Sequence, residues 1–287
     1  MVFGLFSKDR ALQRTIEKAT NKLAQQPDRW GALERLRDDG TDEALYGLCK
    51  RFGITSMKGV EDEQEKNWVV DVLVEHGKAA LAPLVRYMKS ADQLAFPLRV
   101  LERIADKNQQ LEVVDVLVEH GPATLIPLTR YMKTAEQLAF PLKVLERIAG
   151  HDQQLAIVDE LFKTEPPGYV RMPERRIDLI KWFCEHKAMT DAEVVSRITP
   201  YLVDFDENSR FSAIEGLATK DKTLIAEPLV DALLRPEEES GRIRRTIVEV
   251  LEKTKAPLGD RASRVAGMLS GQLADDFKVD GAIVKKK

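Results

Sequence analysis

Apolar residues recur at intervals of three and four along most of the chain, and this spacing predicts amphipathic helices. The segment from Lys78 to Lys89 is a clear case, because Arg86 and Lys89 fall opposite its apolar stripe. That stripe contains Leu81, Leu84, Val85 and Met88. A helix with one apolar face must cover it against a neighbour, so the pattern predicts helices packed on helices.

A second helix is expected over 91–105, with Ser90 as its cap and an apolar stripe that includes Leu94, Leu98 and Leu101. Pro97 lies inside this segment, and we expect it to kink the helix or delay its start to near Phe96. A third helix is expected near Gln109 to His120, ending at Gly121. The pattern therefore predicts three helices in each structural unit.

The same pattern occurs twice at high identity. Residues Val70 to Leu111 recur as Val114 to Leu155, 44 positions later, with 32 of the 42 aligned residues identical. Pro141 repeats Pro97. A repeat of this length is typical of a stacked helical array, in which each unit buries its apolar face against its neighbours. We therefore expect one elongated all-α domain of about six units, each of roughly 40–47 residues.

The predicted organisation has five parts along the chain. They are N-terminal capping helices (1–61), near-identical 44-residue repeats (62–163), a loop or hinge around Pro166-Pro167-Gly168 (164–173), divergent helical repeats (174–276) and a tail (277–287). Upstream helices are expected at 8–25, 28–36 and 42–51, with Asp28 and Thr41 as caps. Downstream helices are expected at 174–186, 191–202, 206–218, 223–234, 238–253 and 260–273. In the tail, Asp280-Gly281 between short apolar alternations predicts a hairpin that docks on the last helix, docks on a partner or frays.

Two segments of the second copy carry a resemblance to a known family. The stretches Ala123 to Lys133 and Gln137 to Ala149 resemble bacterial HEAT or armadillo repeats, and the resemblance covers about 62–163 well. It implies a right-handed α-solenoid with a concave binding surface, and it implies no catalytic activity. Solenoids of this kind serve many functions, so the resemblance predicts a scaffold without naming its partner.

Composition and charge narrow the functional classes. The 44 Lys and Arg residues against 47 Asp and Glu residues give a formal net charge of −3, so no overall field attracts nucleic acid or an anionic membrane. Cys49 and Cys184 lie far apart and lack metal or redox spacing, which indicates a reducing compartment. The start of the chain has neither signal-peptide nor membrane-span character. We therefore expect a soluble cytoplasmic protein.

No catalytic residue, cofactor or metal site is predicted. Three of the histidines follow a glutamate, as in Glu75-His76, whereas HEAT-like iron hydroxylases use the order His then Glu. His76 and His120 each precede a glycine and suit the last turn of a helix, where an imidazole interacts well with the helix dipole. Cys184 lies among Trp182 and Phe183, which predicts a buried structural thiol.

Function is expected to be non-enzymatic protein–protein interaction, with the oligomeric state left open. A helical-repeat nucleic-acid-binding protein, or a HEAT-like lyase or hydroxylase, is the alternative. Basic clusters such as Arg242-x-Arg244-Arg245 lie beside Glu237-Glu238-Glu239, so local charge is balanced and nucleic-acid binding is disfavoured.

The repeated polar residues are the predicted partner-binding set. Stacked repeats align equivalent side chains, and arginine and tyrosine are common at binding hot spots. A periodic row of these cationic and aromatic side chains would suit an acidic or extended partner. A recent duplication that has not yet diverged explains the same identities equally well. The set is Arg86, Tyr87, Lys89, Arg99 and Arg103, with the copies Arg130, Tyr131, Lys133, Lys143 and Arg147.

Overall fold

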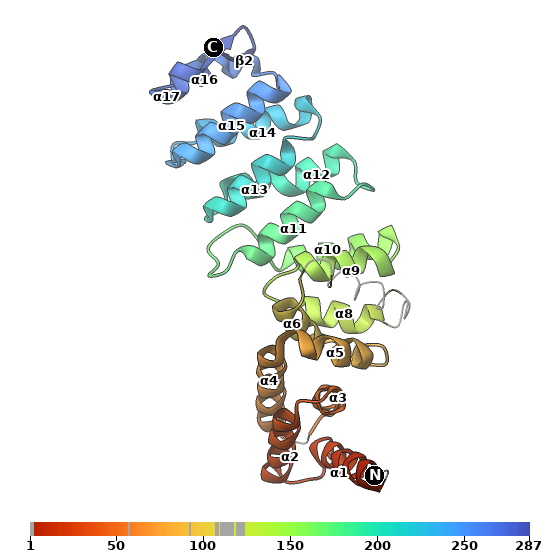
Figure 1. The fold of residues 1–287 in the computed structure, drawn as a ribbon. Helices are drawn as coiled ribbons and strands as arrows, with labels where there is room; N and C mark the ends of the chain where they lie inside the picture. The colour runs from red at the N-terminus through yellow and green to blue at the C-terminus, as the bar shows by residue number, and fades with distance from the viewer. Residues whose placement is uncertain (1–2, 57, 92, 107–108, 110–117, 119–123) are drawn as a thin grey trace. The chain divides into compact units, whose positions relative to one another are not determined.

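The computed structural model describes residues 3–56, 58–91, 93–106, 109, 118 and 124–287. Within this part of the chain the protein is all-helical apart from one short hairpin (Figure 1). It divides into two compact units. The first comprises Met1–Thr134 with Phe140–Gln154, and the second comprises Ala135–Ala139 with Leu155–Lys287. The division therefore lies within the second sequence copy, upstream of the predicted hinge at 164–173.

The helices of the first unit pack in two rows. Helix α2 packs against α4 and α4 against α6, while α3 packs against α5, and α1 contacts both α2 and α3. The helices are α1 (Phe3–Ala19), α2 (Gln26–Asp39), α3 (Asp42–Lys50), α4 (Gly59–His76), α5 (Leu81–Met88), α6 (Ala95–Ile104), α8 (Leu125–Met132) and α9 (Ala139–Ile148). Two 3₁₀ turns, η1 (Arg51–Gly53) and η2 (Gly77–Ala80), connect them, and α10 (His151–Lys163) leads into the second unit.

Helix starts in the first unit follow local chemistry. Thr41 caps α3 as predicted, with its hydroxyl accepting from the Ala44 N–H at 3.4 Å. Pro97 lies in the first turn of α6, where its missing N–H would have no partner in the helix, so the predicted delayed start is confirmed. Two predicted caps are wrong. Ser90 lies in the turn that follows α5, where its N–H donates to the Tyr87 carbonyl, and Leu94 takes the cap position of α6. Helix α2 begins at Gln26 because Pro27 presets the first turn ahead of Asp28.

The third helix predicted at 109–120, with its cap at Gly121, lies almost entirely outside the described residues. Its counterpart one copy earlier is the second half of α4, which ends at Gly77 with φ +57°. Glycine adopts this positive φ without strain, but the ψ of −131° places Gly77 outside the left-handed helical conformation of an ordinary glycine cap. Across the described parts of the chain, no helix is both long and apolar enough to cross a membrane.

The second unit stacks helical pairs. Helix α11 packs on α13 and α13 on α15, while α12 packs on α14 and α14 on α16. The elements are α11 (Glu174–Glu185), α12 (Asp191–Ile198), η4 (Thr199–Val203), α13 (Glu207–Leu217), α14 (Lys222–Leu234), α15 (Gly241–Thr254), η5 (Gly259–Arg261), α16 (Ala262–Met268) and α17 (Gln272–Asp276). The helices predicted at 174–186, 206–218 and 223–234 are confirmed. The α-helix predicted at 191–202 ends at Ile198 and continues as η4, and the helix predicted from 238 begins at Gly241 because Ser240 caps it. The segment 260–273 is interrupted at 269–271, where Gly271 has a φ of +52°.

The predicted C-terminal hairpin is confirmed. Strand β1 (Phe277–Asp280) pairs antiparallel with β2 (Ile283–Lys286), and Gly281 turns the chain with φ +62°. The hairpin packs on α15 and α16, burying Phe277 and Val284, and the Leu258 N–H donates to the Ala282 carbonyl at 2.7 Å. Docking supplies the apolar contacts that an isolated two-stranded ribbon lacks.

Close helix approach in the second unit depends on one glycine. A Cβ added at Gly216 on α13 would lie 2.2 Å from Sγ of Cys184 and 2.9 Å from its Cβ, on α11. Real Cβ atoms do not approach this closely, so α11 and α13 need a residue without a side chain at this point. The predicted role of Cys184 as a buried structural thiol is confirmed by the structure.

Candidate interaction surfaces

The predicted partner-binding residues occupy four helices, and their cations are exposed. Helix α5 carries Arg86 and Lys89 at its end, and α6 carries Arg99 and Arg103. In the second copy the exposed cations are Arg130 and Lys133, on and just after α8, and Lys143 and Arg147 on α9.

The two tyrosines of the predicted set are buried, so their predicted place on the binding surface is wrong. Tyr87 and Tyr131 are only 7% and 3% exposed, so neither contributes to an outer row. Tyr131 donates its hydroxyl to Oε2 of Glu102 at 2.9 Å, and Tyr87 packs edge-on against Phe52 with ring centroids 6.3 Å apart. Both rings fill the interior, and the Tyr131 hydroxyl reaches a polar partner, which is how tyrosine is normally buried.

The cations of the first copy are also divided between the two helix rows. Arg86 on α5 faces α3, where it pairs with Glu43 at 2.7 Å and lies 3.6 Å from the ring centroid of Tyr46. The partners of Arg99 and Arg103 lie instead on α4: Asn67 and Asp71, each at 2.9 Å. Arg86 therefore lies beside α3, and Arg99 and Arg103 lie beside α4. The alignment of equivalent cations from the two copies stays a prediction.

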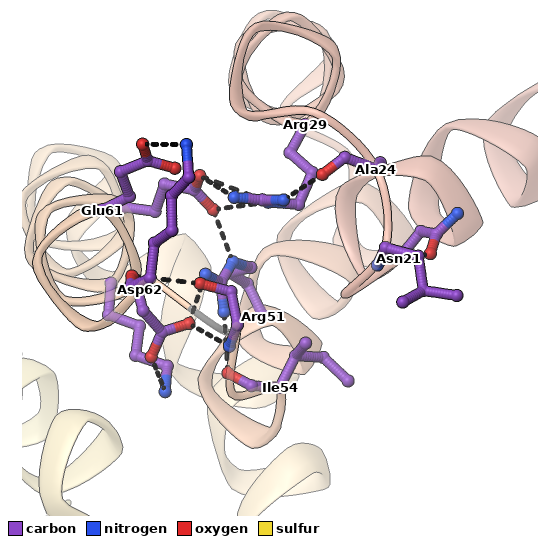
Figure 2. Close-up of polar contacts among 12 residues, drawn as sticks. Asn21, Ala24, Arg29, Arg51, Ile54, Glu61 and Asp62 are labelled. Carbon is purple, nitrogen blue, oxygen red and sulfur yellow. Dashed lines mark hydrogen bonds and ion pairs between the residues drawn. The ribbon is translucent and has the colours of Figure 1, made fainter.

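A buried ion cluster joins three elements of the first unit (Figure 2). Glu65 on α4 accepts from Arg29 of α2 at 2.8 Å and from Arg51 of η1 at 2.8 Å. Arg51 also binds Asp62 at 2.7 Å, and Lys66 pairs with the same carboxylate at 2.8 Å. All five side chains are buried. The cluster fixes α2 and η1 against α4.

Hydrogen bonding within the cluster favours the charged forms of Asp62 and Arg29. Burial by itself would raise the pKa of Asp62, but hydrogen bonds from Lys66, Arg51 and the Ser56 N–H outweigh it and hold that pKa below its usual range. The hydrogen bond to Glu65 raises the pKa of Arg29. Removing any one partner would leave the others charged and buried, which costs far more than the intact pairs contribute.

Neither cysteine has the environment of a nucleophile. Burial raises the pKa of Cys49, and burial raises the pKa of Cys184 to about 12, so both thiols stay protonated at neutral pH. His186, two residues after Cys184, stacks on Trp182 with ring centroids 4.2 Å apart. Within the described ranges, no three His, Cys, Asp or Glu side chains are grouped as a metal site would require.

An aromatic surface lies on the second unit. Tyr169 and Phe205 are 77% and 69% exposed, and their rings meet edge to face with centroids 5.4 Å apart. Near them in sequence, Met172 and Val203 are exposed as well. We refer to these four residues as the aromatic surface. Apolar side chains that contact one another while facing solvent are a mark of interaction sites, whereas single exposed ones are ordinary.

A buried ion pair supports the aromatic surface from beneath. Arg176 on α11 binds Asp204 at 2.7 Å and donates to the Gly168 carbonyl at 2.8 Å. The Gly168 N–H donates in turn to Asp204 at 3.3 Å. Gly168 and Asp204 each directly precede an aromatic residue of the surface, so the pair sets the spacing of the two rings.

The segment 164–173 is anchored at a second point. Tyr201 donates its hydroxyl to the Glu165 carbonyl at 2.9 Å, and Arg175 pairs with the Glu165 carboxylate at 2.8 Å. Together with the Gly168 contacts, these bonds hold both sides of Pro166-Pro167. We therefore expect this predicted hinge to hold one conformation.

Comparison of the chain with protein families, curated proteins and solved structures gave no match. Function must therefore be inferred from the residues that the structure brings together. The aromatic surface was missed at the sequence level because Tyr169 and Phe205 are 36 positions apart and belong to no repeated pattern.

One signal in the sequence does point toward this region. Asp204 accepts from the N–H of the capping residue Asp206 at 2.8 Å, and Glu238, 34 positions later, accepts from the N–H of the cap Ser240 at 2.9 Å. Asp206 is the helix cap that its loop position predicts. Arginines 34 positions apart complete the pattern, since Arg176 pairs with Asp204 and Arg210 with Glu238 at 2.8 Å. This 34-residue spacing, unlike the 44-residue spacing of the duplication, relates successive helical pairs of the second unit.

Proposed function

We propose that the protein is a non-enzymatic interaction scaffold that binds a protein partner through the aromatic surface. The observation that carries this proposal is the exposed contact between Tyr169 and Phe205. Aromatic side chains bury much area at little entropic cost, and they dominate the binding energy of many interfaces. Because Arg176 and Asp204 already fix the two backbone positions, a partner need not order them on binding.

The scaffold we propose is a HEAT or armadillo-like α-solenoid. Two features support this: the 44-residue duplication in the sequence, and the pairwise stacking of α11 to α16 with its 34-residue recurrence of ion pairs. Repeat proteins of this kind bury each unit against the next and bind partners on extended surfaces, most often the concave one. The stacking within the second unit would hold the aromatic surface on a rigid base.

The basic clusters offer less support for nucleic-acid binding. Arg242 lies 4.0 Å from the ring centroid of Phe211 and 3.7 Å from Glu207, and Arg245 pairs with Glu249 and Asp276, each at 2.9 Å. The two arginines lie beside three carboxylates, so they leave no excess of positive charge for a phosphate backbone. These clusters therefore resemble the charged outer face of ordinary helices.

The test is a Tyr169→Ser/Phe205→Ser double variant compared with Ile126→Ser, which removes an equally exposed apolar side chain (70%) from the first unit. Both variants should fold with stability within about 0.5 kcal/mol of wild type, since exposed side chains contribute little. A photo-crosslinking residue at position 169 should capture one defined protein from the native source, insensitive to nuclease. The double variant should lose affinity for that protein, measured with the purified pair, while Ile126→Ser keeps it. Equal affinity of all three forms would refute the proposal.

A further inference from the structure

A separate pocket lies in the first unit, beside the buried ion cluster. It has a volume of about 210 Å³ and opens between the α1–α2 connection and the start of α4. Figure 2 shows this region, with Asn21 and Ala24 on one side of Arg29 and Glu61 on the other. The lining residues are Lys22, Leu23, Ala24, Gln25, Gln26, Arg29, Ser56, Lys58 and Glu61.

The pocket has an excess of positive charge. Lys22, Arg29 and Lys58 line it, against the single carboxylate of Glu61, which Lys58 approaches to 2.9 Å. Behind Arg29, the remaining members of the buried ion cluster are two cations and two carboxylates, which balance. The lining cations therefore exceed the carboxylate by two charges. Asp28 adds nothing to this excess, because it pairs with Lys18 at 3.1 Å.

Arg29 is the built part of this pocket. It is 3% exposed, and the bonds from Nε and Nη2 to Glu65 orient the guanidinium. Its Nη1 donates to the Ala24 carbonyl, in the connection that forms one wall. The group is therefore preorganised, and a ligand would not have to immobilise a flexible side chain.

The first turn of α2 adds a second source of positive potential. The helix has 14 residues, and its capping position, Gln25, makes no side-chain hydrogen bond to the first turn. Gln25 and Gln26 both line the pocket, so the N-terminal end of the helix dipole lies at its wall. Pro27 has no N–H, and Asp28 and Arg29 donate theirs to the Gln25 carbonyl. What the turn offers an anion is therefore the macrodipole and the Gln26 N–H.

We propose that this pocket binds a doubly charged oxyanion of the phosphate class, either inorganic phosphate or the phosphate group of a small monoester. A phosphate monoester carries between about −1.5 and −2 charges at neutral pH, which matches the excess of two. Its oxygens accept hydrogen bonds from a guanidinium and from the lysine ammonium groups of Lys22 and Lys58. The site is independent of the aromatic surface, which belongs to the second unit.

The test is a phosphate titration of the full chain at constant ionic strength, followed by amide NMR and by thermal unfolding. Sodium chloride and sodium acetate serve as the monovalent comparison, and O-phosphoserine as the monoester. We expect saturable shifts at the amides of Gln25, Gln26 and Arg29, with a rise in Tm that chloride does not give. Binding by inorganic phosphate but not by phosphoserine would assign the site to the free ion, and the reverse would assign it to an ester.

Two double variants of lysine to glutamine test phosphate binding at this pocket without removing a member of the buried ion cluster. Lys22→Gln/Lys58→Gln removes two exposed cations at the pocket, and Lys181→Gln/Lys187→Gln removes two exposed cations from the second unit. The first should weaken phosphate affinity at least about tenfold, since one charge-assisted hydrogen bond contributes about that factor, while the second leaves it unchanged. Shifts that never saturate, a Tm rise matched by chloride, or equal loss in both variants would overturn the site.

Discussion

Replacing Gly216 by alanine should destabilise the second unit although alanine is the better helix former. In an open helix this substitution stabilises by about 1 kcal/mol. At Gly216 the added methyl group would lie 2.2 Å from Sγ of Cys184, so α11 and α13 must separate or the Cys184 side chain must move. Cys184 is itself buried, which leaves the thiol little room. Overpacking of this kind costs about 1–3 kcal/mol, and it should outweigh the helix-propensity gain.

Gly267 provides the matched control. It lies in α16 of the same unit, and a Cβ added there would meet no atom within 4 Å. Gly267→Ala should therefore stabilise the unit by about 0.5–1 kcal/mol through the entropy of the unfolded chain and helix propensity. Opposite signs for one substitution at two helical glycines would separate the contact with Cys184 from propensity.

A double-mutant cycle with Cys184→Ala isolates the contact. Removing Sγ takes away the nearest atom, so Gly216→Ala should cost less in the Cys184→Ala background, with a coupling of about 1–2 kcal/mol. Urea unfolding would be followed by the fluorescence of Trp182 on α11, with Trp30 and Trp68 replaced by phenylalanine so that only the second unit reports. Additive effects, or a Gly216→Ala variant as stable as Gly267→Ala, would refute the close packing of these helices.

Three further predictions follow from buried groups. Asp62 has a pKa held below that of the unfolded chain, so its stabilisation is present above about pH 4 and is lost as pH falls through the folded value. Asp62→Asn should therefore lower the free energy of unfolding by about 2–4 kcal/mol at neutral pH. Urea melts at several pH values test this, and a variant that loses stability toward acid pH as steeply as wild type would count against it. Arg176→Ala leaves the Asp204 carboxylate buried without its partner and should lower the free energy of unfolding by about 3–5 kcal/mol. Limited proteolysis of this variant should cut within 164–173. A variant that resists cleavage there as well as wild type does would contradict the anchoring. Alkylation of Cys49 and Cys184 should be at least about a hundredfold slower in the native protein than in urea, and comparable rates by mass spectrometry would show that the thiols are accessible.

Local features of the fold could be predicted from neighbouring residues. Thr41 and Asp206 cap helices because a hydroxyl or carboxylate three positions before a free N–H accepts its hydrogen bond. Pro97 delays a helix, and Asp280-Gly281 turns a hairpin. Each outcome depends on a few adjacent residues, so the sequence carries the information directly. The caps predicted at Ser90 and Asp28 failed where a nearby turn or proline decided the start instead.

The functional surfaces depended on contacts between distant residues. Tyr87 and Tyr131 share a repeated pattern with exposed arginines, yet packing against Phe52 and Glu102 places them in the interior. A helical pattern gives the face of a side chain, but the neighbouring helix decides whether that face is covered. The repeat pattern likewise did not show which neighbour each cation meets: Arg86 pairs with α3, whereas Arg99 and Arg103 bind α4.

The partners of the buried ion pairs could not be predicted from neighbouring residues either. Composition indicated a balanced chain, and sequence proximity suggested that each basic cluster is neutralised locally. The buried pairs instead join Arg29 to Glu65 across 36 positions and Arg176 to Asp204 across 28. Burial strengthens such pairs and makes the loss of one partner costly, but which partners meet is set by helix packing. The sequence thus determined most of the helices and several of their caps, and only the tertiary structure decided the ion pairs, the aromatic surface and the charged pocket.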